Sequence, residues 1–398
     1  MPAVSSSPIP TYFDQLTPTT DDLTDMDLLS LSDHLALIPD PRERRGIRHR
    51  LLPILLIAAA AVCAGARSFT AIGEWAADAP QHILARLAAR RDPCLDRFVA
   101  PGESTLRRIL QRVDAEAVDA AICAWLQERL AHLSQNQAHS RAEAIAVDGK
   151  TMRGTTRPDG SGGVHLLAAF DRGTGTVLAQ ADVPGKASEV AWFAPLLDRI
   201  DLTGVIVTAD ALHTTAEHAR YLHQRGARYV FLVKGNRGYL HRNLLTLPWT
   251  DAQPHHTCDT GHGRHEHRTI QVLPAPVSGV RFPHTAQVFR LARHVTHAGG
   301  RVHRETVHGV TSSADPPVLL ARHIRDHWGI ENRLHWVRDV SYGEDASRVR
   351  VGTAPRVMAG LRNLAISVLR LAGHANIAAG LRHAARDHAR PLTLLGIT

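Results

Sequence analysis

Hydrophobic residues in the first third of the chain recur at helical spacing, as at Leu106, Ile109, Leu110 and Val113. The pattern predicts an all-α N-terminal domain over residues 28–135, with helices over Leu51–Ala66, Phe69–Ala77, Gln81–Arg90, Ser104–Val113 and Asp114–Leu133. The last two helices are joined by almost no loop, which fits either a DNA-reading helix-turn-helix or a plain helical hairpin. Residues 1–27 lack this periodicity and are rich in Ser, Pro, Thr and Asp, so we expect a disordered acidic tail there.

Short apolar segments with strand character replace the helices after the polar stretch 134–140. They are Ala144–Asp148, His165–Phe170, Thr176–Ala181, Gly204–Asp210 and Arg228–Val233. Helical segments separate the later strands, and strand-helix-strand units of this kind form parallel sheets. Residues 141–398 are therefore predicted to be an α/β domain, in which a β-rich insertion covers about 239–317 and a long helix follows over Val318–Val340.

Positive charge is concentrated beyond the first 40 residues, which hold seven aspartates and no lysine or arginine, whereas the whole chain has a formal net charge of +8. This balance fits a polyanionic partner such as double-stranded DNA, although surplus charge that only maintains solubility explains the composition equally well. A basic connector just before the first long helix contains Arg42, Arg44, Arg45, Arg48 and Arg50. We expect these arginines to contact DNA phosphates, and the alternative is a solvated run of charges.

The four cysteines lie far apart without a C-x-x-C pair, which is typical of a protein in a reducing cytoplasm. The longest apolar run, Leu51–Ala66, contains Pro53 and is shorter than the roughly 20 residues that span a bilayer. No basic segment followed by an apolar stretch begins the sequence, so no signal peptide is expected. The sequence thus predicts a cytoplasmic protein without a membrane segment.

Two of the predicted strands end in aspartate, at Asp148 and Asp210. Parallel strands bring their carboxyl ends to one edge of a sheet, where open α/β sheets bind ligands. Either aspartate alone is as well explained by the capping of a turn. A third carboxylate makes a catalytic site the favoured interpretation. Glu331 lies on the predicted long helix and shares a face with His327, His335 and Arg338. Rival third carboxylates follow at Asp339, Glu344 and Asp345.

Carboxylate oxygens without a Cys/His cage suit Mg²⁺ or Mn²⁺, and two such ions about 4 Å apart can clamp the attacking and leaving oxygens of phosphoryl transfer. The three carboxylates therefore predict a two-ion site for phosphodiester chemistry. Basic residues beside the expected strand ends, in a Gly-rich turn or on the face of Glu331 are candidates for DNA contact. They are Lys150, Lys234, Arg264, Arg268, His327 and Arg338.

Three other motifs have weaker functional interpretations. GKT at residues 149–151 resembles the end of a P-loop, but its first glycine would be position 144, which is alanine. Histidines around Cys258 suggest zinc, yet they equally suit the exposed face of a strand, and a second cysteine is missing. Trp328 and Trp336 could stack on a splayed base, although tryptophans on a helix more often belong to a core.

Several sequence blocks, taken together and in order, resemble the DDE insertion-sequence transposases, and in particular the branch associated with H-repeat elements. The blocks are VDGKTMRG around Asp148, PGKASEVAWFAPLL, TADALHT around Asp210, RYVFLVKGN, GHGRHEHR, and HWGIENRLHWVRDVSYGEDASR around Glu331. Nearer the N-terminus, LIPDPRERRGIRH and GESTLRRILQRVD resemble the accessory region of that branch. The resemblance covers most of the chain beyond the tail.

This resemblance implies an RNase H-like catalytic domain in which Asp148, Asp210 and Glu331 bind metal. It also implies a nucleoid-associated bacterial transposase that acts as a homo-oligomer on DNA, binds the inverted repeats of an insertion sequence, cleaves, and transfers 3′ ends. The wider family has Tyr, Arg and Lys around the glutamate at the positions held here by Ile324, His327 and Arg338. Two alternatives stay open: a metal-dependent nuclease without strand transfer, and a non-catalytic DNA-binding relic.

Overall fold

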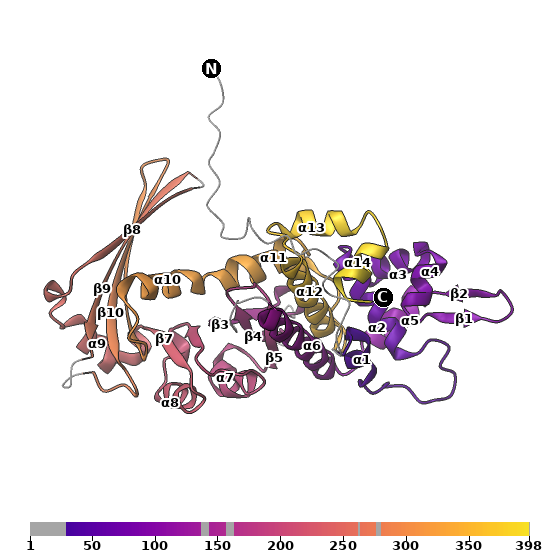
Figure 1. Cartoon of the computed structure of the whole chain (residues 1–398), viewed down its shortest axis with the longest axis horizontal. Helices are drawn as coiled ribbons and strands as arrows, with labels where there is room; N and C mark the ends of the chain where they lie inside the picture. Colours follow the sequence, from indigo (N-terminus) through magenta and orange to yellow (C-terminus); the bar gives the residue numbers. More distant parts are fainter. Residues whose placement is uncertain (1–28, 137–142, 157–162, 262, 276–279, 398) are drawn as a thin grey trace, which may run out of the picture.

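The computed structural model describes residues 29–136, 143–156, 163–261, 263–275 and 280–397, so the predicted acidic tail lies outside the described residues. Its N-terminal third is mostly helical, as predicted, and is drawn in indigo and purple in Figure 1. The elements are α1 (Leu31–Ala36), α2 (Leu51–Cys63), α3 (Phe69–Asp78), α4 (Gln81–Arg86), β1 (Arg90–Asp92), β2 (Arg97–Val99), α5 (Glu103–Leu110) and α6 (Ala115–Asn136).

The prediction that this region is all-α is wrong in one place, because β1 and β2 form an antiparallel hairpin. The helix expected to continue to Arg90 ends at Arg86, and Ala88 adopts a left-handed conformation with φ of 55°. The side chain of Gln81 then satisfies the backbone of the hairpin, accepting from the amide of Phe98 at 2.7 Å and donating to its carbonyl at 3.1 Å. A contact between residues so far apart along the chain is not visible in helical periodicity.

The helix α6 packs against α12 (Ala354–Leu371) and the strand β5, and the exposed positions among its residues 115–133 are all alanines. A recognition helix must present polar side chains to base edges. The covered surface of α6 fits a helical hairpin, and a DNA-reading role for α5 and α6 stays a prediction.

A single sheet of nine strands forms the centre of the protein, in the order β5-β4-β3-β6-β7-β11-β10-β9-β8. The strand β6 is parallel to both β3 and β7, while every other neighbouring pair in this sheet is antiparallel. The predicted α/β architecture is confirmed. The strands are β3 (Ala144–Thr151), β4 (His165–Asp171), β5 (Val177–Val183), β6 (Ile206–Ala209), β7 (Arg228–Val233), β8 (His255–Gly261), β9 (Arg264–Pro274), β10 (Gln287–His297) and β11 (Val302–Thr311).

The β-rich segment expected at about 239–317 does not form a sheet of its own, because β11 pairs with β7 and continues the central sheet. Its long strands extend away from the rest of the protein (Figure 1). Helices cover both faces of the sheet: α7 (Glu189–Leu197), α8 (Ala216–Gln224) and α9 (Gly238–Leu245) share a core with one face, and α10 (Pro317–His327) and α12 with the other.

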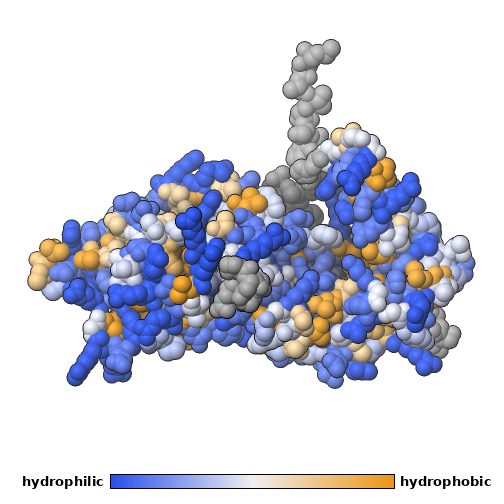
Figure 2. All heavy atoms as spheres, turned by 180° about the vertical axis from the view of Figure 1, so that it is seen from behind, coloured by the Kyte–Doolittle hydropathy of each residue, from blue (hydrophilic) through white to orange (hydrophobic). Residues whose placement is uncertain are grey.

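The N-terminal helices and the C-terminal helices pack into one hydrophobic core. Almost every residue of α2 is buried, and α2 lies against α12 and α14 (Ala389–Leu394), with α13 (Ile377–Ala384) packed on α12. A helix that is apolar all round is stable only when it is covered on all sides. No helix among the described residues is long and apolar enough to cross a membrane. Figure 2 shows one face of the protein, on which hydrophilic residues dominate and hydrophobic ones are scattered.

Candidate active site

The two predicted aspartates lie side by side within the sheet: Asp210 directly follows β6 as predicted, whereas β3 continues beyond Asp148 to Thr151 instead of ending there. Val147 of β3 is the partner of Ala209 in the parallel strand β6, and each is followed directly by its aspartate. Asp148 accepts a hydrogen bond from the amide of Gly149 at 2.9 Å. Asp210 caps the short 3-10 turn η4 (Ala211–His213) by accepting from the amide of Leu212 at 2.9 Å. Parallel register thus brings together two residues that are far apart in sequence.

Glu331 begins a π-helical turn, η7 (Glu331–His335), between α10 and α11 (Trp336–Val340). The predicted single helix over Val318–Val340 is therefore interrupted at the glutamate, and such single π turns are frequent at functional sites. His335 Nδ1 lies 3.0 Å from Glu331 Oε2 and 3.7 Å from Asp148 Oδ2. Among the described residues, these three are the group whose ligand atoms all lie within 4.8 Å of one another.

Burial raises the pKa of Asp148, and the neighbouring carboxylates of Asp210 and Glu189 act in the same direction, while His335 opposes them. The hydrogen bond from His335 lowers the pKa of Glu331, which is more exposed. Neighbouring carboxylates repel one another, and the raised pKa of Asp148 reflects this. A divalent cation bound between them would offset the repulsion. The sequence predicts His335 on the same helical face as Glu331 but indicates no role for it; the spacing of four residues between the two is the signal that could have revealed their contact.

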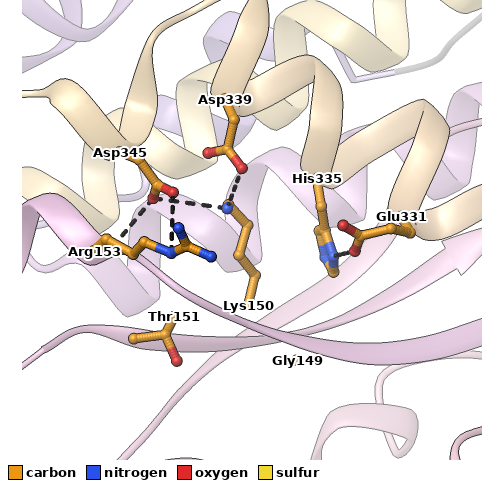
Figure 3. Close-up of a pocket in the computed structure, with 8 residues that line it drawn as sticks. All are labelled: Gly149, Lys150, Thr151, Arg153, Glu331, His335, Asp339 and Asp345. Carbon is orange, nitrogen blue, oxygen red and sulfur yellow. Dashed lines mark hydrogen bonds and ion pairs between the residues drawn. The ribbon is translucent and has the colours of Figure 1, made fainter.

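A cavity of about 360 Å³ opens beside this group, lined by Gly149, Lys150, Thr151, Arg153, Glu331, His335, Asp339 and Asp345. Figure 3 shows Lys150 reaching across it toward Asp339, with Nζ 2.6 Å from Asp339 Oδ2 and 3.8 Å from Asp345 Oδ1. Asp345 also accepts from the backbone amide of Arg153 at 3.1 Å. Two of the three rival carboxylates are therefore paired with a lysine, whereas Glu331 faces Asp148 and His335.

The third rival, Glu344, and the predicted DNA contact Arg338 are both interior residues. Arg338 is 0% and Glu344 1% exposed, and Arg338 Nη2 lies 2.7 Å from Glu344 Oε1. The buried Arg362 contacts the other oxygen of Glu344 at 2.9 Å. Assigning Arg338 to DNA contact was wrong. The π turn adds a residue to the helical repeat, so positions beyond it rotate away from the face of Glu331.

Four more predicted DNA contacts are occupied within the protein. Arg42 forms an ion pair with Asp40 at 2.6 Å and donates to the carbonyl of His49 at 2.8 Å. The side chain of Arg268 is only 14% exposed, lying 2.9 Å from Asp259 and 2.8 Å from Glu266. His327 Nδ1 lies 3.0 Å from Thr208 Oγ1, and burial lowers the pKa of His327 to about 4. Lys150 is paired with Asp339, and its side chain is only 10% exposed. The remaining candidates are exposed: Arg44, Arg45, Arg48, Arg50, Lys234 and Arg264.

Trp328 and Trp336 flank the π turn and are 58% and 55% exposed. The interpretation of these tryptophans as core residues is therefore wrong. Large exposed aromatic rings next to the turn that carries Glu331 offer flat surfaces on which nucleic-acid bases can stack.

Comparison with known proteins places this site in a defined context. Residues 139–368 match the family model described as "Transposase DDE domain", and residues 32–126 match the one described as "DDE_Tnp_1-associated". "Putative transposase YncI" of Escherichia coli O157:H7 is 30% identical over 87% of this chain and 88% of its own length. "H repeat-associated putative transposase YhhI" of Escherichia coli K12 is 27% identical over 86% of this chain and 91% of its own.

The structure of a piggyBac transposase synaptic complex with hairpin DNA overlaps 86% of this chain and 71% of that chain. The overlap has a TM-score of 0.43 and 10% sequence identity.

Proposed function

Since the chain belongs to the family of proteins with a transposase DDE domain, we propose that it binds the terminal inverted repeats of an insertion sequence, cleaves DNA and transfers the 3′ ends to target DNA. The proposal is supported by two observations: Asp148 and Asp210 come directly after the paired residues Val147 and Ala209, and the ligand atoms of Asp148, Glu331 and His335 lie within 4.8 Å of one another, beside a cavity with a lysine and an arginine. Clustered carboxylates bind the metal, and cations beside them bind the phosphate.

We propose that the catalytic domain is RNase H-like. Support comes from the five strands β5-β4-β3-β6-β7, in which three antiparallel strands are followed by two that run parallel to β3. Asp148 lies in β3 and Asp210 directly after β6, and Ile330 and Leu334 beside Glu331 share a hydrophobic core with Ala146 of β3. Open α/β sheets bind ligands at this edge of the strands.

The side chains present fit Mg²⁺ or Mn²⁺, with Asp148, Asp210 and Glu331 as the residues that would hold two ions. These ions, when bound, would activate water or a DNA 3′-hydroxyl and stabilise the leaving oxygen. Imidazole is a softer ligand than such ions favour. His335 therefore fits better as the hydrogen-bond partner that orients Glu331, and Lys150 as a cation that can leave Asp339 to bind a phosphate.

The proposed partner is double-stranded DNA, at the element ends and at the target, bound by a homo-oligomer in the bacterial cytoplasm and associated with the nucleoid. Affinity would come mainly from contacts between arginines and phosphates, which release counterions and make binding sensitive to salt.

Joining of pre-cut ends tests the proposal most directly. Incubated with pre-cut inverted-repeat DNA and a plasmid target, the protein is expected to produce joined strands in Mg²⁺ or Mn²⁺ and none in excess EDTA. Products are resolved on a denaturing gel. Cleavage without joining would favour the nuclease, tight binding with neither reaction would favour the relic, and full activity in EDTA would exclude the metal mechanism.

The exposed part of the basic connector should act in DNA binding without specifying sequence. Replacing Arg44, Arg45 and Arg48 by alanine is expected to weaken binding to all sequences alike. It should also flatten the slope of log affinity against log salt by up to about 0.9 per lost phosphate contact. Fluorescence anisotropy at several salt concentrations measures both effects. An unchanged slope would identify these residues as solvated charges only.

A further inference from the structure

A buried polar cluster lies behind the two aspartates and has no place in the proposed chemistry. Its members are Glu189, His165 and His213, which are 3%, 3% and 0% exposed. They come from three separate elements: the first turn of α7, the start of β4, and the turn η4 that Asp210 caps. A charged group is rarely fully buried unless it is paired, so this cluster is a specific feature of the fold.

Glu189 uses both carboxylate oxygens to join these elements. His165 Nε2 lies 2.7 Å from Oε1, and His213 Nε2 lies 3.2 Å from Oε2. The other ring nitrogen of His165 is hydrogen-bonded to Thr151 Oγ1 at 2.7 Å, at the end of the strand that carries Asp148. One carboxylate thus connects the segment after Asp148 with the segment after Asp210.

A second link ties the start of α7 to the same turn. His218 lies with Nδ1 2.9 Å from the carbonyl oxygen of His213 and Nε2 2.9 Å from that of Val190. Its ring stacks on Phe193 of α7, with centroids 4.1 Å apart. The turn that carries Asp210 is therefore anchored to α7 at two points.

The cluster packs closely against Gly149, the residue after Asp148. A β-carbon placed on Gly149 would lie 2.5 Å from Glu189 Oε1 and 2.7 Å from His165 Nε2. Such distances are far inside van der Waals contact, so the carboxylate can approach β3 only because this residue is glycine. The close packing of Glu189 against β3 therefore explains why position 149, in the VDGK block, is a glycine.

Burial acts to raise the pKa of Glu189, but the hydrogen bonds from His165 and His213 outweigh it and hold this pKa at about 2. Glu189 is therefore ionised at neutral pH. An ionised carboxylate costs several kcal/mol to bury, and its hydrogen-bond partners must offset that cost. A buried carboxylate with both oxygens hydrogen-bonded cannot move without breaking those bonds. It is therefore suited to fixing the relative position of the two backbone segments that its partners belong to.

We propose that Glu189 is a positioning residue that fixes the separation of Asp148 and Asp210 for divalent-cation binding. The inference rests on the proposed function. Both carboxylate oxygens of the buried Glu189 are hydrogen-bonded to histidines, so it acts through His165 on the end of β3 and through His213 on the turn after β6. Residues that orient metal ligands from behind typically change metal affinity about 10- to 100-fold when they are replaced.

The test measures Mn²⁺ binding to the DNA-free full-length chain by electron paramagnetic resonance, so it needs no catalysis. Glu189→Ala is expected to raise the Mn²⁺ dissociation constant by about 10- to 100-fold. Glu189→Gln keeps one accepting oxygen and should have a smaller effect in the same direction. The matched control is Leu197→Ala, a fully buried residue of the same helix that is remote from the cluster's hydrogen bonds, and it should leave the constant unchanged.

Circular dichroism and thermal denaturation establish that each variant is folded, and Glu189→Gln replaces Glu189→Ala if the latter does not fold. Wild-type Mn²⁺ affinity in the glutamate variants, or an equal loss in Leu197→Ala, would overturn the proposal. Asp148→Asn distinguishes failure of the positioning role from failure of the proposed metal site. If it loses Mn²⁺ binding while the Glu189 variants do not, only the positioning role fails. If it binds Mn²⁺ normally, the proposed metal site itself is wrong.

Discussion

Replacing Asp148 by asparagine is expected to reduce DNA cleavage by at least about a thousand-fold, because metal-ion stabilisation of the transition state contributes several kcal/mol. Binding of inverted-repeat DNA should change little, since asparagine keeps the shape of the side chain. Stability should also hold, because burial already raises the pKa of Asp148 and disfavours its charge. Asp210→Asn is expected to behave in the same way, and asparagine can still cap η4.

Cleavage of labelled end DNA and its binding by gel shift measure the two properties separately. The matched control is Asp339→Asn, which removes a carboxylate from the same cavity but from the ion pair with Lys150 rather than from the Asp148 group. It should retain far more activity than Asp148→Asn. A parallel loss of binding and cleavage in the aspartate variants, or loss of neither, would mean that the site is misplaced.

Glu331→Gln is expected to lose DNA cleavage but keep its stability, whereas Glu344→Gln is expected to lose stability but keep cleavage. The Glu331 side chain is 53% exposed, so its replacement should leave the free energy of unfolding nearly unchanged while cleavage falls as in Asp148→Asn. Burial acts to raise the pKa of Glu344, but Arg338 and Arg362 outweigh it and lower that pKa. Removing the charge leaves two buried arginines uncompensated and should cost about 3–5 kcal/mol of stability.

Urea denaturation gives the stability, and cleavage is compared per folded molecule at a temperature where both variants are native. Folded Glu344→Gln should cut DNA, and folded Glu331→Gln should not. The opposite pattern would transfer the third ligand to Glu344, and an inactive Asp339→Asn beside an active Glu331→Gln would transfer it to Asp339.

The strands and the pair of aspartates were predictable from the sequence because both depend on a local pattern of apolar residues. A short apolar run that leads into an aspartate specifies a buried strand and places the carboxylate on it or directly after it, and the strand-helix-strand order of β6, α8 and β7 specifies their parallel pairing. The segment Arg228–Val233 was predicted with the bounds that β7 has in the structure. The apolar composition of Leu51–Ala66 likewise determined that this segment is buried.

What only the tertiary structure decided is which partner each polar side chain meets. Arg42, Arg268 and Arg338 have the same chemistry as exposed arginines, and only long-range packing neutralises them with Asp40, Glu266 and Glu344. Helical spacing could not reveal the π turn at Glu331, which rotates Arg338 into the core. Nor could it place Glu189 behind Asp148, because that contact depends on α7, β4 and η4 folding together. Periodicity reports how much of a segment is buried, whereas charge pairing depends on atoms brought together from distant parts of the chain.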